Sequence, residues 1–234
     1  MIEVEWWDYD DRPELVEAVA GDIGFIIESA LDARGQALIA LPGDAAFAPI
    51  YEKLAATRLK WKNVTIIPTG DRVVAVDHPE SKVAVLARQF LPRGARVLPI
   101  AADAAADYKA AGKAADARLA DLQWPPDLVW LDVGADGHGA SIYAGPDLDE
   151  ALDGPKTRRA IGVMNEADGL AHVSLTRAAI LSARTLMLAF EGAEIQQVLE
   201  RAIKDGPLSG APIGRILAET ELPIDIHWLN ADPS

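Results

Sequence analysis

The sequence predicts an α/β fold in which a mainly parallel sheet carries helices on both faces. Helical and strand-like segments alternate along the chain with short connections, which is the pattern of such a sheet. Half of the 234 residues are hydrophobic, which is enough to fill one large core. We find no internal repeat, low-complexity tract or linker, and therefore interpret residues 1–234 as a single domain.

The first half of the chain begins with an expected helix over residues 13–33, where apolar residues recur at a helical spacing. Pro13 suits the first turn of this helix, and Gly35 suits its end. A short buried strand is expected at 37–41 and closes in Pro42-Gly43. The next expected elements are a helix at 47–57, a strand at 64–67, a helix at 82–90, a strand at 96–100 and an alanine-rich helix at 104–122.

The second half continues the alternation from an apolar strand at 127–133. Later strands are expected at 160–164, 172–175, 185–190 and 224–228. Helices are expected between them at 177–183, 194–204 and 213–217.

The composition excludes several classes of function. Acidic residues outnumber basic ones, 36 to 22, which disfavours nucleic acid or an anionic membrane as partner but leaves room for a local basic pocket. No stretch approaches the roughly 20 apolar residues of a membrane span. The chain has no cysteine, so it has no disulfide or thiolate metal site, and its first residues lack the features of a secretion signal. We therefore expect a cytoplasmic protein.

A glycine-broken loop follows the strand at 127–133 and carries Asp136 and His138. In parallel α/β sheets ligands bind beyond the carboxyl ends of the strands, and glycines let the backbone approach a ligand closely. An imidazole oriented by a carboxylate can act as a general base near neutral pH. The alternatives for His138 are a solvated loop histidine, a helix cap, or a metal ligand together with Asp132 and Asp136. Ser141 is interpreted as a helix N-cap.

Motifs in a fixed order cover nearly the whole chain and together resemble the 6-phosphogluconolactonase family, which is related to the glucosamine-6-phosphate deaminases and isomerases. The motifs are Leu41-Pro42-Gly43, Pro49-Ile50-Tyr51, Trp61, Asp71-Arg72, His78-Pro79-Glu80-Ser81, Asp127-Leu128-Val129, Asp136-Gly137-His138, Ser174-Leu175-Thr176, Gly192, Gly206-Pro207-Leu208-Ser209 with Pro212-Ile213, and Pro223-Ile224-Asp225-Ile226-His227-Trp228.

The resemblance implies a modified Rossmann-like fold and hydrolysis of 6-phosphoglucono-δ-lactone to 6-phosphogluconate in the pentose phosphate and Entner–Doudoroff routes. It implies no cofactor and no metal. His138 would be the general base that activates water, and Asp136 would orient it. The tetrahedral oxyanion could be stabilised by backbone N–H groups of a glycine loop. By position, the substrate-binding residues would be Gly43, Asp44, Arg72, Gly137 and His172.

The sequence departs from the family pattern where the substrate phosphate is expected. The phosphate turn reads Gly43-Asp44-Ala45-Ala46-Phe47, with alanines in place of two hydroxyl residues and a carboxylate in place of a glycine. Further departures are Gly70 for an aspartate, Lys82 for an asparagine, Gly139 for a threonine, His172 for an arginine and Ile195 for a lysine. Losing charge-assisted contacts should weaken phosphate recognition.

Three of the residues at these positions have two interpretations each. Asp44 either caps the following helix or repels a phosphate, unless it turns away or is neutralised. Arg72 either contacts an anion or pairs with Asp71. Lys82 either replaces a lost positive charge or begins a solvated helix face, and we favour the solvated face.

The functional hypotheses are therefore a 6-phosphogluconolactonase, a lactonase for a different or unphosphorylated lactone, and a non-catalytic descendant that binds a ligand or a protein. An aldose-phosphate deaminase or isomerase is disfavoured, because Gly70 stands where the proton-abstracting aspartate is expected. The expected partner is a sugar phosphate or a sugar lactone.

Overall fold

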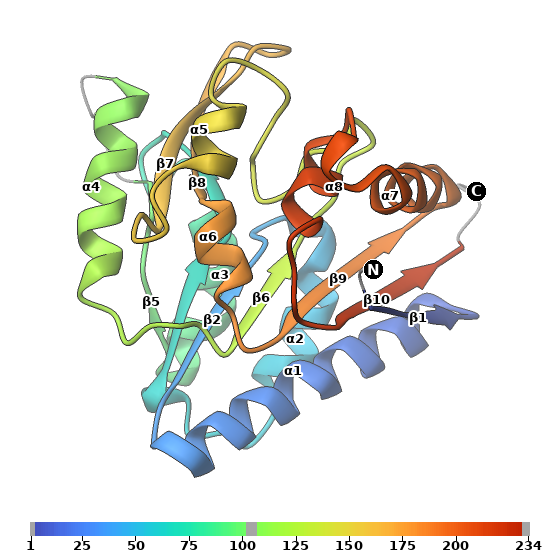
Figure 1. The fold of residues 1–234 in the computed structure, drawn as a ribbon. Helices are drawn as coiled ribbons and strands as arrows, with labels where there is room; N and C mark the ends of the chain where they lie inside the picture. The colour runs from blue at the N-terminus through green and yellow to red at the C-terminus, as the bar shows by residue number, and fades with distance from the viewer. Residues whose placement is uncertain (1–2, 102–106, 231–234) are drawn as a thin grey trace.

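The centre of the molecule is a sheet of seven parallel strands in the order β1-β10-β9-β6-β2-β3-β5 (Figure 1). The computed structural model describes residues 3–101 and 107–230. The predicted mainly parallel sheet is confirmed. The strands are β1 (Val4–Tyr9), β2 (Ala37–Leu41), β3 (Val64–Pro68), β5 (Arg96–Val97), β6 (Leu128–Leu131), β9 (Leu186–Glu191) and β10 (Ile224–Leu229).

Helices cover both faces of this sheet, as the sequence predicts (Figure 1). One face carries α1 (Arg12–Arg34), α2 (Ala48–Ala55) and α3 (Lys82–Phe90). The other carries α4 (Tyr108–Ala120), α5 (Leu148–Asp153), α6 (Arg177–Leu181), α7 (Ala193–Asp205) and α8 (Pro212–Leu217). Short 3-10 turns, η1 (Ala45–Phe47), η2 (Trp61–Asn63), η3 (Leu91–Arg93) and η4 (Gly206–Leu208), join some of them.

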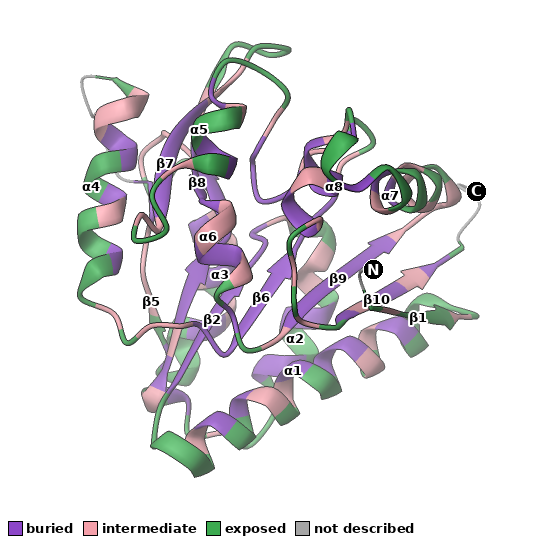
Figure 2. Cartoon of the chain, in the orientation of Figure 1, coloured by how far each residue is buried: buried purple, intermediate pink, exposed green. Residues whose placement is uncertain are grey.

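The two hydrophobic layers follow from the alternation of side chains along each strand. In β2, Ile39 and Leu41 pack with α1 to α3, whereas Leu38 and Ala40 pack with the helices of the opposite face. Every residue of β2 is buried, because a parallel strand between two helical layers has no solvent face. Figure 2 shows this buried band running through the centre of the molecule.

The ends of α1 are set by local chemistry, and both predicted signals are confirmed. The Asp11 side chain accepts a hydrogen bond from Glu14 N at 2.8 Å, and Pro13 lies in the first turn. Gly35 ends the helix in the left-handed conformation with φ 74° and donates its N–H to Leu31 O at 2.8 Å. The helix therefore begins and ends within a residue or two of the predicted bounds.

A second sheet of three antiparallel strands differs from the expected single parallel sheet. It has the order β4-β8-β7 and consists of β4 (Gly70–Arg72), β7 (Ala160–Asn165) and β8 (Leu170–Leu175). The residues between β7 and β8 are too few for a parallel crossover, so the two strands form a hairpin. The small sheet packs beside α4, where Gly162 contacts the Tyr108 carbonyl.

Several element bounds also differ from the predictions. β1, β4 and α5 were not predicted at all, and β5 ends at Val97 rather than at residue 100. The alanine-rich helix begins at Tyr108, with the Asp107 side chain accepting from Ala110 N at 2.6 Å; residues 104–106 lie outside the described residues. Among the described residues, no helix has the length and apolar character needed to cross a bilayer.

The strand order reverses between β2 and β6. From β2 the chain adds β3 and β5 on one side, and then returns to place β6, β9 and β10 on the other. Such a reversal leaves a crevice at the carboxyl ends of the two central strands, where ligands bind in open α/β sheets. The segments that follow β2 and β6 are residues 42–47 and 132–141.

Candidate active site

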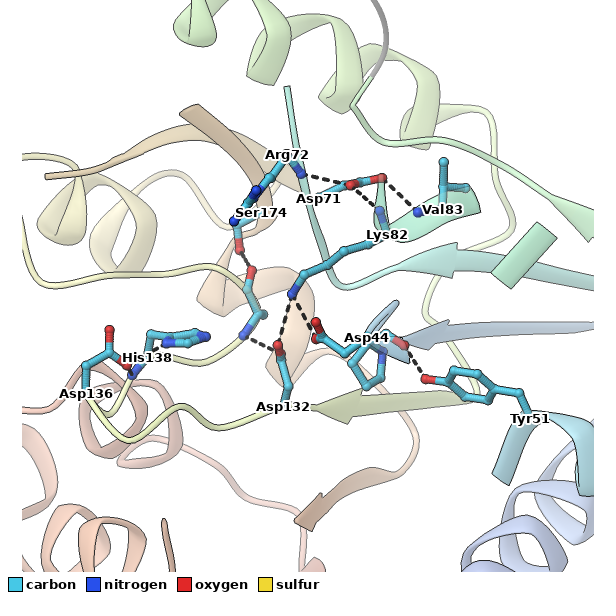
Figure 3. A network of polar contacts seen from close by, with 12 residues as sticks. Asp44, Tyr51, Asp71, Arg72, Lys82, Val83, Asp132, Asp136, His138 and Ser174 are labelled. Carbon is cyan, nitrogen blue, oxygen red and sulfur yellow. Dashed lines mark hydrogen bonds and ion pairs between the residues drawn. The ribbon is translucent and has the colours of Figure 1, made fainter. Parts of the chain in front are cut away.

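Asp136 and His138 lie at this reversal point, on the loop after β6, and their side chains contact each other (Figure 3). His138 Nδ1 is 2.5 Å from Asp136 Oδ1, and the same oxygen accepts the His138 backbone N–H at 3.1 Å. Gly137, between them, has φ 78°, a conformation that glycine adopts without the steric cost of a Cβ. The structure thus brings the two predicted residues together in the geometry of an oriented imidazole.

The electrostatics of this pair favour a charged carboxylate. Partial burial would raise the pKa of Asp136, but the backbone N–H and imidazole of His138 outweigh burial and lower that pKa. The side chain of Asp136 is 58% exposed, whereas that of His138 is 20% exposed. The imidazole is therefore partly enclosed, with a charged partner held on its Nδ1 side.

The rest of the loop is closed by hydrogen bonds from its own backbone. Gly134 N donates to His138 O at 3.2 Å, and Gly137 N donates to Gly134 O at 2.9 Å. Ala140 N donates to Asp132 Oδ1 at 3.1 Å. These three amides and the His138 amide are therefore engaged in hydrogen bonds within the loop.

Ser141 does not cap a helix, and the expectation that it would is wrong. It is fully buried with φ 68°, it follows Ala140 at φ 54°, and the next helix begins only at Leu148. Two consecutive non-glycine residues in the left-handed region are costly, and such strain concentrates at functional sites. Here it bends the chain sharply directly after the His138 loop.

Lys82 is the centre of a three-residue ion cluster that joins the two loops (Figure 3). Its Nζ lies 3.1 Å from Asp44 Oδ2 and 3.2 Å from Asp132 Oδ2, and its side chain is only 15% exposed. The expected solvated helix face is therefore wrong, and Asp44 is neutralised. Asp44 precedes η1 but makes no side-chain capping bond.

The pKa values in this cluster reflect mutual stabilisation of buried charges. Burial alone would lower the pKa of Lys82, but the charges of Asp132 and Asp44 raise it well above its usual range. Burial would likewise raise the pKa of Asp132, but Lys82 lowers it to about 2. Lys82 and Asp132 therefore both stay charged across the physiological pH range.

Arg72 pairs with Glu80 and not with Asp71. An ion pair joins Arg72 Nη1 to Glu80 Oε1. The Asp71 carboxylate instead accepts backbone N–H groups of Lys82 at 2.7 Å and Val83 at 3.0 Å, and so caps the start of α3. Arg72 therefore faces the site with its charge already compensated.

Gly70 is glycine because the His138 loop occupies the space beside it. A Cβ added at Gly70 would lie 2.3 Å from the Ala140 carbonyl oxygen and 2.4 Å from Ser141 Oγ. No aspartate fits there without moving the loop. The missing carboxylate is thus a steric consequence of how β4 packs against residues 140–141.

His172 and Tyr143 form an aromatic wall next to His138. The Tyr143 ring centroid lies 4.7 Å from that of His138 and 5.2 Å from that of His172. Burial and the nearby Lys82 lower the pKa of His172 to about 4, so it is neutral near pH 7. Burial raises the pKa of Tyr143, so its phenol keeps its proton. His172 therefore supplies no charge where the family pattern has an arginine.

The remaining predicted positions border the same crevice. Gly43 lies directly against the Lys82 backbone, and the Tyr51 hydroxyl donates to the Pro42 carbonyl, which fixes the turn after β2. Ile195, in α7, lines an apolar cavity together with Ala46 and Phe47. Within residues 3–101 and 107–230, no group of three potential ligands is arranged to hold a metal ion.

Sequence reasoning missed the roles of Lys82 and Tyr143. Asp44 and Lys82 were both departures from the family pattern, one acidic and one basic, and their opposite signs were the signal that they meet in space. Tyr143 had a weaker signal, since it stands only five residues after His138.

The chain is similar in sequence to a protein family and to individual relatives over nearly its full length. The sequence profile described as glucosamine-6-phosphate isomerases/6-phosphogluconolactonase matches residues 10–228. A protein of Rhizobium meliloti named 6-phosphogluconolactonase is 32% identical over 224 residues, covering 94% of this chain and 96% of the relative. One of Mesorhizobium japonicum with the same name is 30% identical over 227 residues, covering 95% and 94%.

Solved structures share the fold at lower identity. A 6-phosphogluconolactonase from Shewanella baltica has a TM-score of 0.90 at 23% identity, covering 97% of this chain and 98% of that one. A monomeric glucosamine-6-phosphate deaminase has a TM-score of 0.75 at 16% identity, covering 96% and 97%. The predicted modified Rossmann-like fold is confirmed.

Proposed function

The chain belongs to the family of glucosamine-6-phosphate isomerases and 6-phosphogluconolactonases, and we propose that it is a lactonase that opens a sugar δ-lactone with water activated by His138. The relatives named 6-phosphogluconolactonase make 6-phosphoglucono-δ-lactone the reference substrate, with 6-phosphogluconate as product. The observation that carries the proposal is the 2.5 Å contact between His138 Nδ1 and Asp136 at the reversal point of the sheet.

The reaction follows from this contact. With Nδ1 facing the Asp136 carboxylate, Nε2 is free to take a proton from water as the water oxygen bonds to the lactone carbonyl carbon. The resulting tetrahedral oxyanion then collapses, the ring C–O bond breaks, and the imidazolium returns its proton to the departing ring oxygen. Asp136 stabilises the imidazolium between these two proton transfers.

The oxyanion needs a hydrogen-bond donor, and four amides of the His138 loop, those of Gly134, Gly137, His138 and Ala140, already donate within the loop. Tyr143 is our candidate: its ring packs on His138, and its phenol keeps its proton at neutral pH. A donor positioned in advance of the reaction stabilises the developing charge without reorganisation. Lys82 and Asp132 hold the loop in place and do not take part in proton transfer.

Neither competing function is favoured by a specific observation. A deaminase or isomerase would need a carboxylate near Gly70, where the Ala140 carbonyl and Ser141 hydroxyl already fill the space. A non-catalytic descendant would not need an oriented, partly enclosed imidazole.

The test compares lactone disappearance above the spontaneous rate for the wild type and for His138→Ala. We expect a loss of about 10²–10⁴-fold in kcat, the usual contribution of a positioned proton-transfer group. His78→Ala is the matched control, since His78 is exposed and lies in another loop, and it should keep full activity. Equal rates for the wild type and His138→Ala would reject the proposal.

A further inference from the structure

An apolar cavity of about 220 Å³ opens beside the candidate active site, between the turn after β2, the end of β9 and the start of α7. Its wall includes Ala46, Phe47, Val133, Phe190 and Ile195. Phe47 is fixed by its packing on the Trp130 ring, with centroids 4.7 Å apart. This is the place where the family pattern has the hydroxyls of its phosphate turn and a lysine.

The cavity is next to the acid–base loop. Val133 lines the cavity and belongs to the loop that carries His138. Ile195 also lines it, and Val198, one helical turn further along α7, lies against Gly137, with its Cγ1 3.6 Å from where a Cβ would sit.

The charges around the crevice do not favour a phosphate. Each nearby cation is already paired: Lys82 with Asp44 and Asp132, Arg72 with Glu80, and Arg12, at the cavity rim, with Glu191. With Asp136 the five carboxylates outnumber the three cations. A phosphate would add negative charge to a partly buried site that offers it no uncommitted cation among these residues.

We propose that the cavity receives an uncharged, apolar ring substituent, so that the preferred substrate class is δ-lactones without a phosphate group. The inference rests on the proposed lactonase activity and narrows its substrate. The ring ester would lie at His138, and the substituent on the far side of the ring would pack against Phe47 and Ile195. In an apolar pocket, burial of each additional methylene is favourable in free energy, whereas burial of a charged group of the same size is unfavourable.

The test measures kcat/KM for three lactones: 6-phosphoglucono-δ-lactone, glucono-δ-lactone and a δ-lactone that carries a propyl group in place of the phosphorylated carbon. We expect the propyl lactone to exceed the phosphorylated one by at least about tenfold, corresponding to about 1.4 kcal/mol. A preference for the phosphorylated lactone would overturn the inference while leaving the proposed lactonase intact.

Two variants localise the preference to the cavity. Ile195→Lys should lower kcat/KM for the propyl lactone and raise it for the phosphorylated one, whereas Ile195→Leu, the matched control, should keep the wild-type order. Ala46→Phe fills the cavity from an exposed position without burying a charge, and should selectively reduce turnover of the propyl lactone. If both Ile195→Lys and Ala46→Phe kept the wild-type ratio of kcat/KM between the propyl and the phosphorylated lactone, the assignment of the substituent to this cavity would be overturned.

Calorimetric titration separates this inference from the proposed function. The probes are the ring-opened propyl hydroxy acid and 6-phosphogluconate, titrated into the wild type and Ala46→Phe. If no lactone is hydrolysed in a His138-dependent manner, the lactonase proposal fails. The cavity assignment still stands if the propyl acid alone binds and Ala46→Phe abolishes that binding, and it fails if 6-phosphogluconate binds more tightly.

Discussion

The loops after β2 and β6 lie at the same edge of the sheet, but they differ in the contacts that hold each loop in place. The loop after β6 carries the proposed reacting pair, Asp136 and His138, only two residues apart, and hydrogen bonds of its own backbone close it. The turn after β2 depends on distant partners: Lys82 neutralises Asp44, and Tyr51 holds Pro42. In the proposed function, the proton-transfer pair therefore lies within one loop, whereas the residues that border the substrate come from separate segments.

Removing Lys82 should have the largest effect on stability, because this one ammonium holds both loops. Lys82→Met leaves Asp132, whose side chain is 9% exposed, without its ion pair. Breaking a buried pair from one side costs about 3–5 kcal/mol of unfolding free energy, measured by urea denaturation. It should also loosen the Ala140 contact and reduce kcat.

The double variant Lys82→Met/Asp132→Asn is the control for this effect. It removes both charges of the Lys82–Asp132 pair and leaves only the Asp44 carboxylate, which is 46% exposed, so it should recover much of the lost stability. If Lys82→Met were as stable as the wild type, the Lys82 ion pairs would not hold the two loops together.

Stability in acid depends on buried histidines of both the scaffold and the site, because the pKa of His172, like that of His227, is lowered to about 4. Burial lowers the pKa of His227 to about 4, and this residue lies in β10, away from both loops. As the pH falls from about 6.5 to about 4, the unfolded chain protonates this histidine before the folded one does, so unfolding free energy declines by about 3 kcal/mol.

His227→Asn should remove that part of the pH dependence and leave lactonase activity at neutral pH unchanged. The measurement is the free energy of unfolding between pH 7 and pH 4, for the variant and for the wild type. A variant curve parallel to that of the wild type would show that His227 does not titrate in this range.

Relieving the strained bend after the His138 loop should give the smallest effect on stability. The free energy of unfolding should rise rather than fall. Ser141→Gly relieves a buried residue at φ 68° and should raise unfolding free energy by about 1 kcal/mol. Ala114→Gly, at an exposed position inside α4, introduces the same residue and should lower it by about 1 kcal/mol. If the melting temperatures of Ser141→Gly and Ala114→Gly moved in the same direction, the backbone at Ser141 would not be strained.

The sequence predicts most of the parallel scaffold, because a strand covered on both faces reads as a continuous apolar run, as in β2 and β6. It predicts the Asp136–His138 pair, because the two residues are close in sequence. It fails for β1, where Trp6-Trp7 interrupts the pattern and one tryptophan stays 48% exposed. It fails also for the Lys82 cluster and the apolar cavity, since both join segments whose contact only the folded chain creates.

The pairing of β1 with β10 has a consequence for how the protein is made. Val4–Tyr9 lies parallel to Ile224–Leu229 at one end of the sheet, and Tyr9 Oη is 2.7 Å from His227 Nδ1. During synthesis β1 therefore stays without its partner strand until β10, far along the chain, has been made. Contacts of such long sequence separation close slowly. We expect the exposed edge of β1 to be the segment of the nascent chain most in need of a chaperone.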